Sequence, residues 1–299
     1  MNILAIEFFT RNQLIFGIAA YRTLYPNIKF QDLFLITEKS LNKSYIFDDL
    51  IETFLRKEFL NIHIVDRKSI RSINGREMES VKILSPSLFP YKIFFKLFSF
   101  KKTQVIRYEE GIGFYLSFYN YFTNLLSHRF FYLSLRCIFG FGLQRVAKFF
   151  GYCDSIRLFN RDLSINFPYR KNLELILRSI KKPLVESRYD VLLLANNLVQ
   201  AKQLIANYSS VNFLIKKHPR FYSDDDKFSQ TDEVEFILSN YTAEECIIFF
   251  DIPKVCGFES STLLYAPAIL NTESVNIKFE LTVEPVLLRL FQRYTTQHK

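Results

Sequence analysis

The first candidates for chemistry are two adjacent carboxylates. Glu109 and Glu110 close the strand-like run TQVIRYEE and precede Gly111 and Gly113. A carboxylate on a turn at a strand end, partly buried and beside a like charge, suits the role of general base. The alternative interpretation is an ordinary solvated acidic turn, and the pair alone does not decide between the two.

The second candidate is a histidine in a basic cluster. His218 and Pro219 close the run NFLIKKHPR, in which Lys216, Lys217 and Arg220 are the neighbouring cations. Proline disfavours helix before it and keeps the histidine extended at the strand end. The cations make a corner suited to a phosphate. A lone histidine at a strand end is also compatible with a purely structural role.

The third candidate is a run of hydroxyls. Ser260, Ser261 and Thr262 stand between VCGFE and the apolar helical run LLYAPAIL. Hydroxyls at a helix N-terminus can cap the helix and can bind phosphate together with free backbone N–H groups. Capping alone would need only one of the three.

Alternating strands and helices must position these groups. The runs NILAIEFF, DLFLIT, NIHIV, TQVIRYEE and DSIRLF predict strands in the first part, and YDVLLLANN, NFLIKKHPR, EVEFILS and KVCGFESS predict strands in the second. Helical patterns separate most of them, which favours parallel sheets covered on both faces. Each candidate group follows a predicted strand, where such sheets bind ligands.

A break in the pattern marks two domains. Between Arg161 and Arg188, two prolines flank a helix-like segment rich in charge. We therefore expect a first domain over 1–165, a linker over 166–184 and a second domain over 185–299. The expected fold class is α/β, of the GT-B type, with two Rossmann-like doubly wound domains that meet at a cleft.

Together the three motifs resemble those of bacterial sialyltransferases. Glu109-Glu110-Gly111, His218-Pro219 and Ser260-Ser261 follow the order and spacing of that family, nearest to family 52 lipooligosaccharide sialyltransferases and capsular polysialyltransferases. The opening AIEFFTRNQL is similar to the family's first strand and Thr-x-x-Gln loop, with Thr10 and Gln13 matching on the acceptor side. Asn196 and Asn197 match the start of its nucleotide-binding domain.

The resemblance implies an enzyme that transfers sialic acid or a related nonulosonic acid from a CMP donor to a glycan. The transfer would be inverting, without metal or cofactor, in lipooligosaccharide or capsule biosynthesis. Glu109, matching the first acid, would deprotonate the acceptor. His218 would stabilise the leaving phosphate, which Ser260 and Ser261 would bind. Further donor-side candidates are Gly111, Lys216, Pro219, Thr262, Asn196 and Asn197.

Two departures from the family pattern leave roles open. Glu110 stands where many members carry Asp, so the base within the acidic pair is not settled. Arg11 stands where relatives often carry Pro, which leaves the acceptor contact of the Thr10 loop open.

Composition indicates the compartment and the partners. The chain has 39 Lys+Arg against 30 Asp+Glu, which favours anionic partners. Its four cysteines lack Cys-x-x-Cys spacing, and its first residues predict a strand rather than a signal peptide, so we expect a cytoplasmic protein. Residues 88–152 mix Phe and Tyr with Lys and Arg, which fits peripheral inner-membrane contact beside a lipid-linked acceptor or, equally, a core with one solvated basic face.

Other functions stay open at this point. Asp224-Asp225-Asp226 contains an Asp-x-Asp metal motif, but its surroundings predict a solvated loop, and a CMP donor needs no metal–diphosphate bridge. No second-domain glutamate has another glutamate eight positions on, which argues against a retaining GT-B enzyme. A related transferase for a different nucleotide sugar, such as glucose, or a non-catalytic capsule-assembly protein remains an alternative. Aromatics concentrated in predicted helices argue against nucleic-acid binding.

Overall fold

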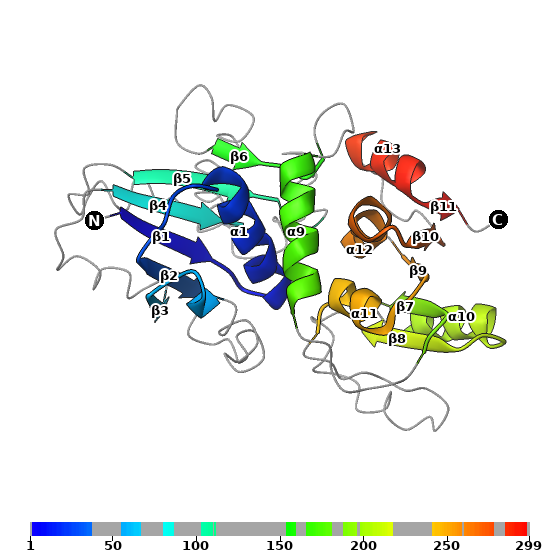
Figure 1. Cartoon of the computed structure of the whole chain (residues 1–299). Coiled ribbons are helices and arrows are strands. Elements are labelled where there is room, and N and C mark those ends of the chain that lie inside the picture. The colour runs from blue at the N-terminus through cyan, green and yellow to red at the C-terminus, as the bar shows by residue number, and fades with distance from the viewer. Residues whose placement is uncertain are drawn as a thin grey trace, which may run out of the picture. The chain divides into compact units, whose positions relative to one another are not determined.

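The computed structural model describes residues 2–37, 55–66, 80–86, 103–109, 111, 154–159, 166–180, 188–195, 198–217, 241–258, 260–277 and 285–297. The chain divides into two compact units (Figure 1). Unit 1 comprises Met1–Asn160 and Asn166–Ile180, and unit 2 comprises Arg161–Ile165 and Lys181–Lys299. Each unit is an α/β structure built on its own parallel sheet.

Unit 1 contains a six-stranded sheet in the order β3-β2-β1-β4-β5-β6. Its strands are β1 (Asn2–Glu7), β2 (Asp32–Thr37), β3 (Asn61–Asp66), β4 (Ser80–Ser85), β5 (Thr103–Tyr108) and β6 (Asp154–Ile156). Every pairing is parallel. The chain starts in the middle of the sheet, builds one half outward and then the other, so the strand order reverses between β1 and β4. This is the doubly wound order that the alternation of elements predicts.

Helix α1 (Arg11–Leu24) packs closely on this sheet. A Cβ atom on Gly17 would lie 2.6 Å from Ile6 Cγ2 and 3.3 Å from the Tyr108 ring, so any larger residue here would force the Ile6 side chain to shift. Leu14 to Tyr21 are all buried, which means that the face of α1 turned away from the sheet is covered too.

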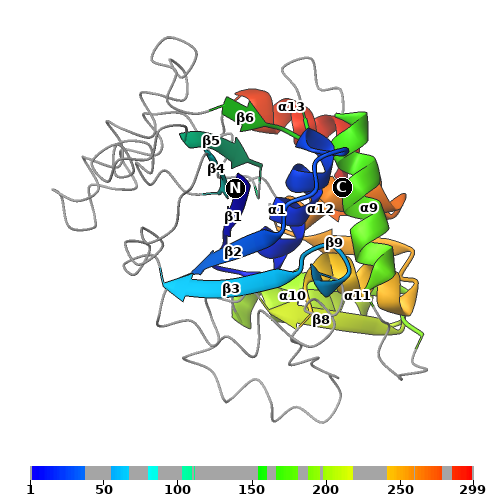
Figure 2. The same cartoon turned by 60° about the vertical axis from the view of Figure 1, so that its left-hand side comes forward.

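Helix α9 (Phe167–Ser179) supplies that cover. It lies beside α1 in both views (Figures 1 and 2), and its Tyr169 ring meets Phe16 edge to face, with centroids 6.2 Å apart. The interval 166–184, expected to be a linker, therefore contains a helix that belongs to unit 1. Its apolar face, which includes Leu173, Ile176 and Leu177, is buried and needs a partner.

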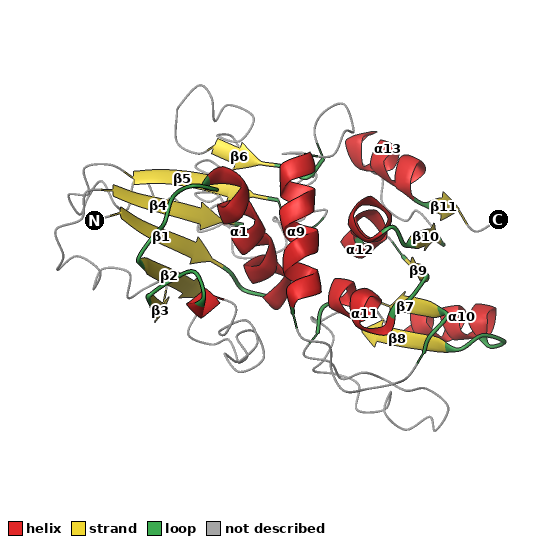
Figure 3. Ribbon diagram, in the orientation of Figure 1, coloured by secondary structure: helices red, strands yellow, loops and turns green. Residues whose placement is uncertain are grey.

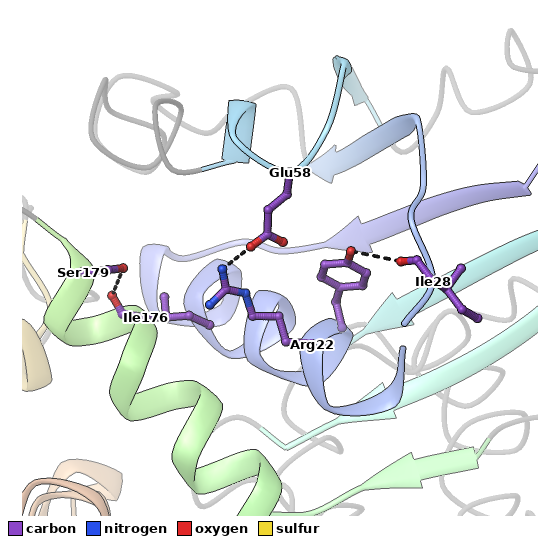
Figure 4. A network of polar contacts seen from close by, with 6 residues as sticks. Arg22, Ile28, Glu58, Ile176 and Ser179 are labelled. Atoms are coloured by element: carbon purple, nitrogen blue, oxygen red, sulfur yellow. Dashed lines mark hydrogen bonds and ion pairs between the residues drawn. The ribbon is translucent and has the colours of Figure 1, made fainter. Parts of the chain in front are cut away.

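Partly exposed polar contacts lie at the C-terminal ends of α1 and α9. Arg22, in the last turn of α1, pairs with Glu58, and the Ser179 hydroxyl at the end of α9 donates to the Ile176 carbonyl at 2.7 Å (Figure 4). A cation in a last turn also complements the helix dipole. Contacts of this kind contribute little to stability, because water competes with them.

Unit 2 contains a five-stranded parallel sheet in the order β11-β10-β9-β7-β8. Its strands are β7 (Val191–Ala195), β8 (Phe213–Lys217), β9 (Lys254–Gly257), β10 (Glu273–Asn276) and β11 (Thr296–Gln297). The order reverses between β7 and β9, so this sheet is doubly wound as well. Helices α10 (Leu198–Tyr208), α11 (Ala243–Phe250), α12 (Ser261–Tyr265) and α13 (Pro285–Tyr294), with the π-helix Ala266–Leu270, complete the described part (Figure 3).

Two of the four cysteines lie in unit 2, and both are buried with free thiols. They are Cys246 and Cys256, and Cys137 and Cys153 lie outside the described residues. The Cys256 thiol donates to the Tyr208 hydroxyl oxygen at 2.9 Å, and burial raises the pKa of this thiol to about 11. A thiol that stays protonated inside a core is chemically inert.

Candidate functional site

The acidic motif follows β5, at the carboxyl edge of the unit 1 sheet. Glu109 is fully buried, and its carboxylate oxygen Oε2 accepts from the backbone N–H groups of Leu158 at 2.5 Å and Phe159 at 3.3 Å. Its own backbone N–H donates to the Ile156 carbonyl at 3.0 Å. Glu109 therefore joins the end of β5 to the segment that follows β6. Glu110 lies outside the described residues.

The turn after the acidic pair requires its glycine. Gly111 has φ 78°, in the left-handed region that residues with a Cβ rarely adopt. The Tyr169 hydroxyl of α9 donates to the Glu109 carbonyl at 3.0 Å, just before this turn. Hydrogen bonds at the N–H and at the carbonyl of Glu109 thus hold its backbone at the point where the motif leaves the sheet.

A second buried acid lies where the strand order of unit 1 reverses. Glu7 ends β1, and the hydroxyl of Ser85, which ends β4, donates to its Oε2. The Tyr108 hydroxyl donates to the Glu7 carbonyl at 2.6 Å. Arg11 and Arg107 are buried as well, at 2% and 8% exposure, so this edge holds cations together with acids. These residues are not among the site residues predicted from the sequence. For Glu7 and Ser85, the available signal was a polar side chain at the end of a strand.

Thr10 and Gln13, predicted on the acceptor side, form the N-terminal cap of α1. The Thr10 hydroxyl oxygen accepts from the Gln13 backbone N–H at 3.2 Å, and Gln13 Oε1 accepts from the Phe9 backbone N–H at 2.7 Å. This is a variant of the capping box that Ser/Thr-x-x-Glu/Gln sequences form. The Thr-x-x-Gln spacing is therefore explained by helix capping, and a contact with an acceptor stays a prediction.

In unit 2, the strands that precede the donor-side motifs are neighbours. β7 lies between β8 and β9, with Ala195 paired to Lys217 and Leu194 paired to Gly257. The three strands are parallel and end level with one another. The chain then continues from β7 into Asn196 and Asn197, from β8 into His218 and Pro219, and from β9 toward Ser260. Asn196, Asn197, His218 and Pro219 themselves lie outside the described residues.

Lys216 is a buried cation rather than a surface one. It is 7% exposed, and its Nζ donates to the Tyr241 carbonyl at 2.6 Å. Burial lowers the pKa of the Lys216 ammonium, while nearby Glu244 and Glu245 act in the opposite direction. The predicted direct contact between Lys216 and a phosphate stays a prediction, and the structure shows this ammonium bonded within the protein.

The three hydroxyls at the start of α12 have different environments. Ser260 is the N-cap, and its oxygen accepts from the Thr262 backbone N–H at 3.3 Å. Ser261, the first helical residue, is partly exposed. Thr262 is buried, and its hydroxyl donates to Glu244 Oε1 at 3.0 Å. Ser260 and Ser261 are thus the two members of the run with accessible surface.

Glu244 on α11 is a further residue of this region, and the sequence analysis did not select it. Thr242 and Glu245 form a capping box, in which Glu245 Oε2 accepts from the Thr242 N–H at 2.7 Å and Thr242 Oγ1 accepts from the Glu245 N–H at 3.1 Å. Glu244 takes no part in that box and is 2% exposed. Burial raises the pKa of its carboxyl, which the Thr262 hydrogen bond and the Lys216 charge only partly offset. The available signal was the first acid of TAEE, Glu244, which the capping box does not use.

Two further observations apply to the described residues: one concerns metal ligands and the other concerns membrane-spanning helices. Within the described ranges, no group of three or more His, Cys, Asp or Glu side chains could hold a metal ion. No helix among those residues is long and apolar enough to cross a bilayer. Asp224–Asp226 and most of 88–152 lie outside the described residues.

No protein-family model matches this sequence, and no curated protein matches it at a significant level. Solved structures do match. The α/β-galactoside α-2,3-sialyltransferase of Photobacterium phosphoreum is similar with a TM-score of 0.57 and 13% identity, over 99% of this chain and 98% of that chain. The GT-B domain of a Photobacterium damselae sialyltransferase is similar with a TM-score of 0.50 and 12% identity, over 98% and 96% of the two chains. This chain therefore has the α/β GT-B fold.

Proposed function

We propose that this protein is a glycosyltransferase that moves a nonulosonic acid, sialic acid or a relative, from a CMP donor to a glycan hydroxyl. The observation that carries the proposal is the level ending of β8, β7 and β9, whose continuations hold His218-Pro219, Asn196-Asn197 and Ser260-Ser261. Open α/β sheets bind ligands outside the carboxyl ends of their strands where the order reverses, which in this sheet is between β7 and β9. The motif resemblance and the GT-B fold supply the reaction class.

The reaction assigns one task to each motif. A carboxylate of the acidic pair accepts the proton of the acceptor hydroxyl, and the acceptor oxygen forms a bond to the anomeric carbon. The bond from that carbon to the phosphate oxygen breaks on the opposite face, and its electron pair leaves with CMP. His218 stabilises the developing phosphate charge, and the Ser260 and Ser261 hydroxyls bind it. The configuration inverts, and no metal takes part.

The buried position of Glu109 bears on which acid is the base. Its Oε2 already accepts two backbone hydrogen bonds, so substitution of Glu109 disturbs the turn as well as any proton transfer. Substitution of Glu110 tests the second carboxylate by itself. Measuring both the activity and the thermal stability of each variant distinguishes a role in proton transfer from a role in holding the turn.

Thermal stability with nucleotides tests the donor directly. We expect CMP, without added metal, to raise the Tm by several degrees, since a ligand that binds only the native state stabilises it. UMP, UDP and GDP should raise it less, and His218→Ala should reduce the CMP effect. Stabilisation by UDP or GDP instead of CMP would overturn the CMP donor while leaving nucleotide-sugar transfer. No stabilisation by any nucleotide would count against the enzyme and favour an assembly role.

We also propose that the acceptor is a lipid-linked glycan at the inner membrane face. The motivation is the alternation of Phe and Tyr with Lys and Arg over 88–152. Co-sedimentation with vesicles that contain anionic lipid, at low salt, measures such contact. Protein that remains in the supernatant at low salt would remove the membrane from the proposal.

A further inference from the structure

Three buried polar side chains of unit 2 lie on elements that carry the donor-side motifs. Lys216 belongs to β8, Glu244 to α11 and Thr262 to α12, and their exposed fractions are 7%, 2% and 6%. Thr262 donates its hydroxyl to Glu244 Oε1 at 3.0 Å, and Lys216 donates to the Tyr241 carbonyl, immediately before the N-cap of α11, at 2.6 Å. We call these three residues the inner polar network.

The inner polar network connects its elements more firmly than apolar packing alone would. A buried cation and a buried carboxyl each lose hydration, so each depends on partners inside the protein. Lys216 finds its partner in the Tyr241 carbonyl, next to α11, and Glu244 finds one in the Thr262 hydroxyl of α12. When such a network loses one member, the remaining polar groups are left buried without full compensation. The relative placement of β8, α11 and α12 is therefore sensitive to each member.

Two members adjoin the residues assigned to the donor phosphate. Lys216 stands two positions before His218, on the strand that leads to it. Thr262 directly follows Ser261, and its backbone N–H donates to the Ser260 oxygen while its hydroxyl donates to Glu244. One residue thus joins the cap of α12 to the interior of the unit. Glu244 is the acceptor that fixes the orientation of the Thr262 side chain.

We propose that Glu244 is a positioning residue for the donor site, acting through Thr262 on Ser260 and Ser261. This inference rests on the proposed function, because it assumes that the Ser260–Ser261 turn binds the donor phosphate. Glu244 itself contacts no donor atom in this assignment. Its effect is preorganisation, since hydroxyls held in place before binding lose less freedom when the ligand arrives.

The competing explanation is that the inner polar network only stabilises unit 2. The two explanations differ in what they predict for nucleotide affinity. A purely stabilising network lowers the Tm when it is broken but leaves CMP affinity unchanged in protein that is still folded. A positioning network lowers affinity by more than a stability loss of the same size does elsewhere in the unit.

Thr262→Val tests this with a matched control. Valine keeps the shape of threonine and removes the hydroxyl that reaches Glu244. Thr295→Val makes the same change at another buried threonine of unit 2, whose hydroxyl donates to the Phe291 carbonyl at 2.7 Å after α13. We expect Thr262→Val to weaken CMP binding about tenfold, a free-energy change of about 1.4 kcal/mol. Thr295→Val should lower the Tm by a similar amount and leave the CMP Kd unchanged.

Two substitutions of Glu244 complete the test. Glu244→Gln keeps an oxygen that accepts from Thr262, so CMP affinity should stay within about threefold of wild type, whereas Glu244→Ala removes the acceptor and should weaken binding as Thr262→Val does. CMP is titrated into each variant by calorimetry, at a temperature at which circular dichroism shows that the variant is folded.

The outcomes separate the two proposals. Wild-type affinity in Thr262→Val and Glu244→Ala, with CMP bound normally by wild type, would overturn the positioning role and leave the proposed function intact. If both Thr→Val variants lose affinity equally, the loss is a general stability effect and the positioning role is also overturned. Failure of the wild-type protein to bind CMP would overturn the donor assignment and, with it, this inference.

Discussion

At the carboxyl edge of the unit 1 sheet, a buried acid accepts from the backbone of the neighbouring segment, whereas in unit 2 a buried acid accepts from the side chain of a neighbouring helix. Glu109 accepts from the N–H groups of Leu158 and Phe159, and Glu244 accepts from the Thr262 hydroxyl in the neighbourhood of Lys216. Backbone donors belong to the fold and persist through most substitutions. A side-chain network depends on each member, so a single substitution can change the geometry of the unit 2 edge.

Under the proposed function the two edges would have different tasks. In unit 1 the acid motif is attached to the sheet by bonds that are independent of a ligand, as a fixed proton acceptor would require. In unit 2 the Thr262 hydroxyl links the Ser260–Ser261 turn to Glu244, so we expect the position of this turn to respond to side-chain chemistry. The following substitutions test this contrast.

The largest expected effect is on catalysis, at the acidic pair. Glutamine in place of the general base should lower kcat by about 10²–10⁴, the usual contribution of such a group, with little change in CMP affinity. We expect this loss for only one of Glu109→Gln and Glu110→Gln, measured with a CMP-sugar donor and a glycan acceptor. A loss below tenfold in both variants would remove the pair from proton transfer.

Unfolding measurements should show how much Glu109 contributes to the stability of the protein. Glu109→Ala leaves the Leu158 and Phe159 N–H groups without their carboxylate acceptor, at a cost of about 1–3 kcal/mol for each buried donor. Glu109→Gln keeps one acceptor oxygen and should cost less. The measurement is the free energy of unfolding by urea. Equal stability of Glu109→Ala and wild type would show that these bonds contribute nothing.

Two glycines test how tightly each sheet is packed. A Cβ on Gly257 would lie 2.8 Å from Leu194 Cβ and 2.9 Å from its carbonyl oxygen, whereas a Cβ on Gly17 would first meet the γ2 methyl of the Ile6 side chain. Because backbone yields less easily than a side chain, Gly257→Ala should cost about 1–3 kcal/mol. Gly17→Ala should cost less, since alanine also favours helix by about 1 kcal/mol. The reverse order in urea unfolding would contradict the packing at Gly257.

The smallest expected effect is a pH dependence at Glu244. Burial raises the pKa of this carboxyl above its ordinary 4.5, so the native state keeps a proton that the unfolded chain releases. The resulting stability is fully present below pH 4.5 and is lost as the pH rises through the folded pKa. Glu244→Gln lacks this loss, so its Tm relative to wild type should increase from pH 5 to pH 8.

Lys216 titrates in both proteins, so its own pH dependence cancels to first order in the difference between them. Its lowered pKa has the opposite slope, because stability is lost as the pH falls through the folded value. Parallel Tm curves for wild type and Glu244→Gln across this range would show that Glu244 is not protonated in the fold.

Much of the architecture was predictable from the sequence because its signals are local. Short apolar runs such as those of β1, β2 and β7 alternate with helical patterns, and this alternation predicts parallel, doubly wound sheets. The sequence does not predict strand β4, because the apolar residues of SVKILS are interrupted by Lys82 and flanked by serines, which leaves no clear apolar run. Helix α9 was found as a helix, but its membership of unit 1 depends on the contact of Tyr169 with Phe16, far away in the chain.

The features of the candidate site likewise divide into those that the sequence predicts and those that depend on packing. Which motifs follow strands could be predicted from the sequence, since a strand and the turn after it are neighbours in the chain. The burial of Lys216 and the bond from Thr262 to Glu244 depend on how distant segments pack. Those outcomes depend on which backbone groups and side chains lose contact with water when the elements pack. Burial of that kind is a property of the assembled unit, which no single stretch of residues specifies.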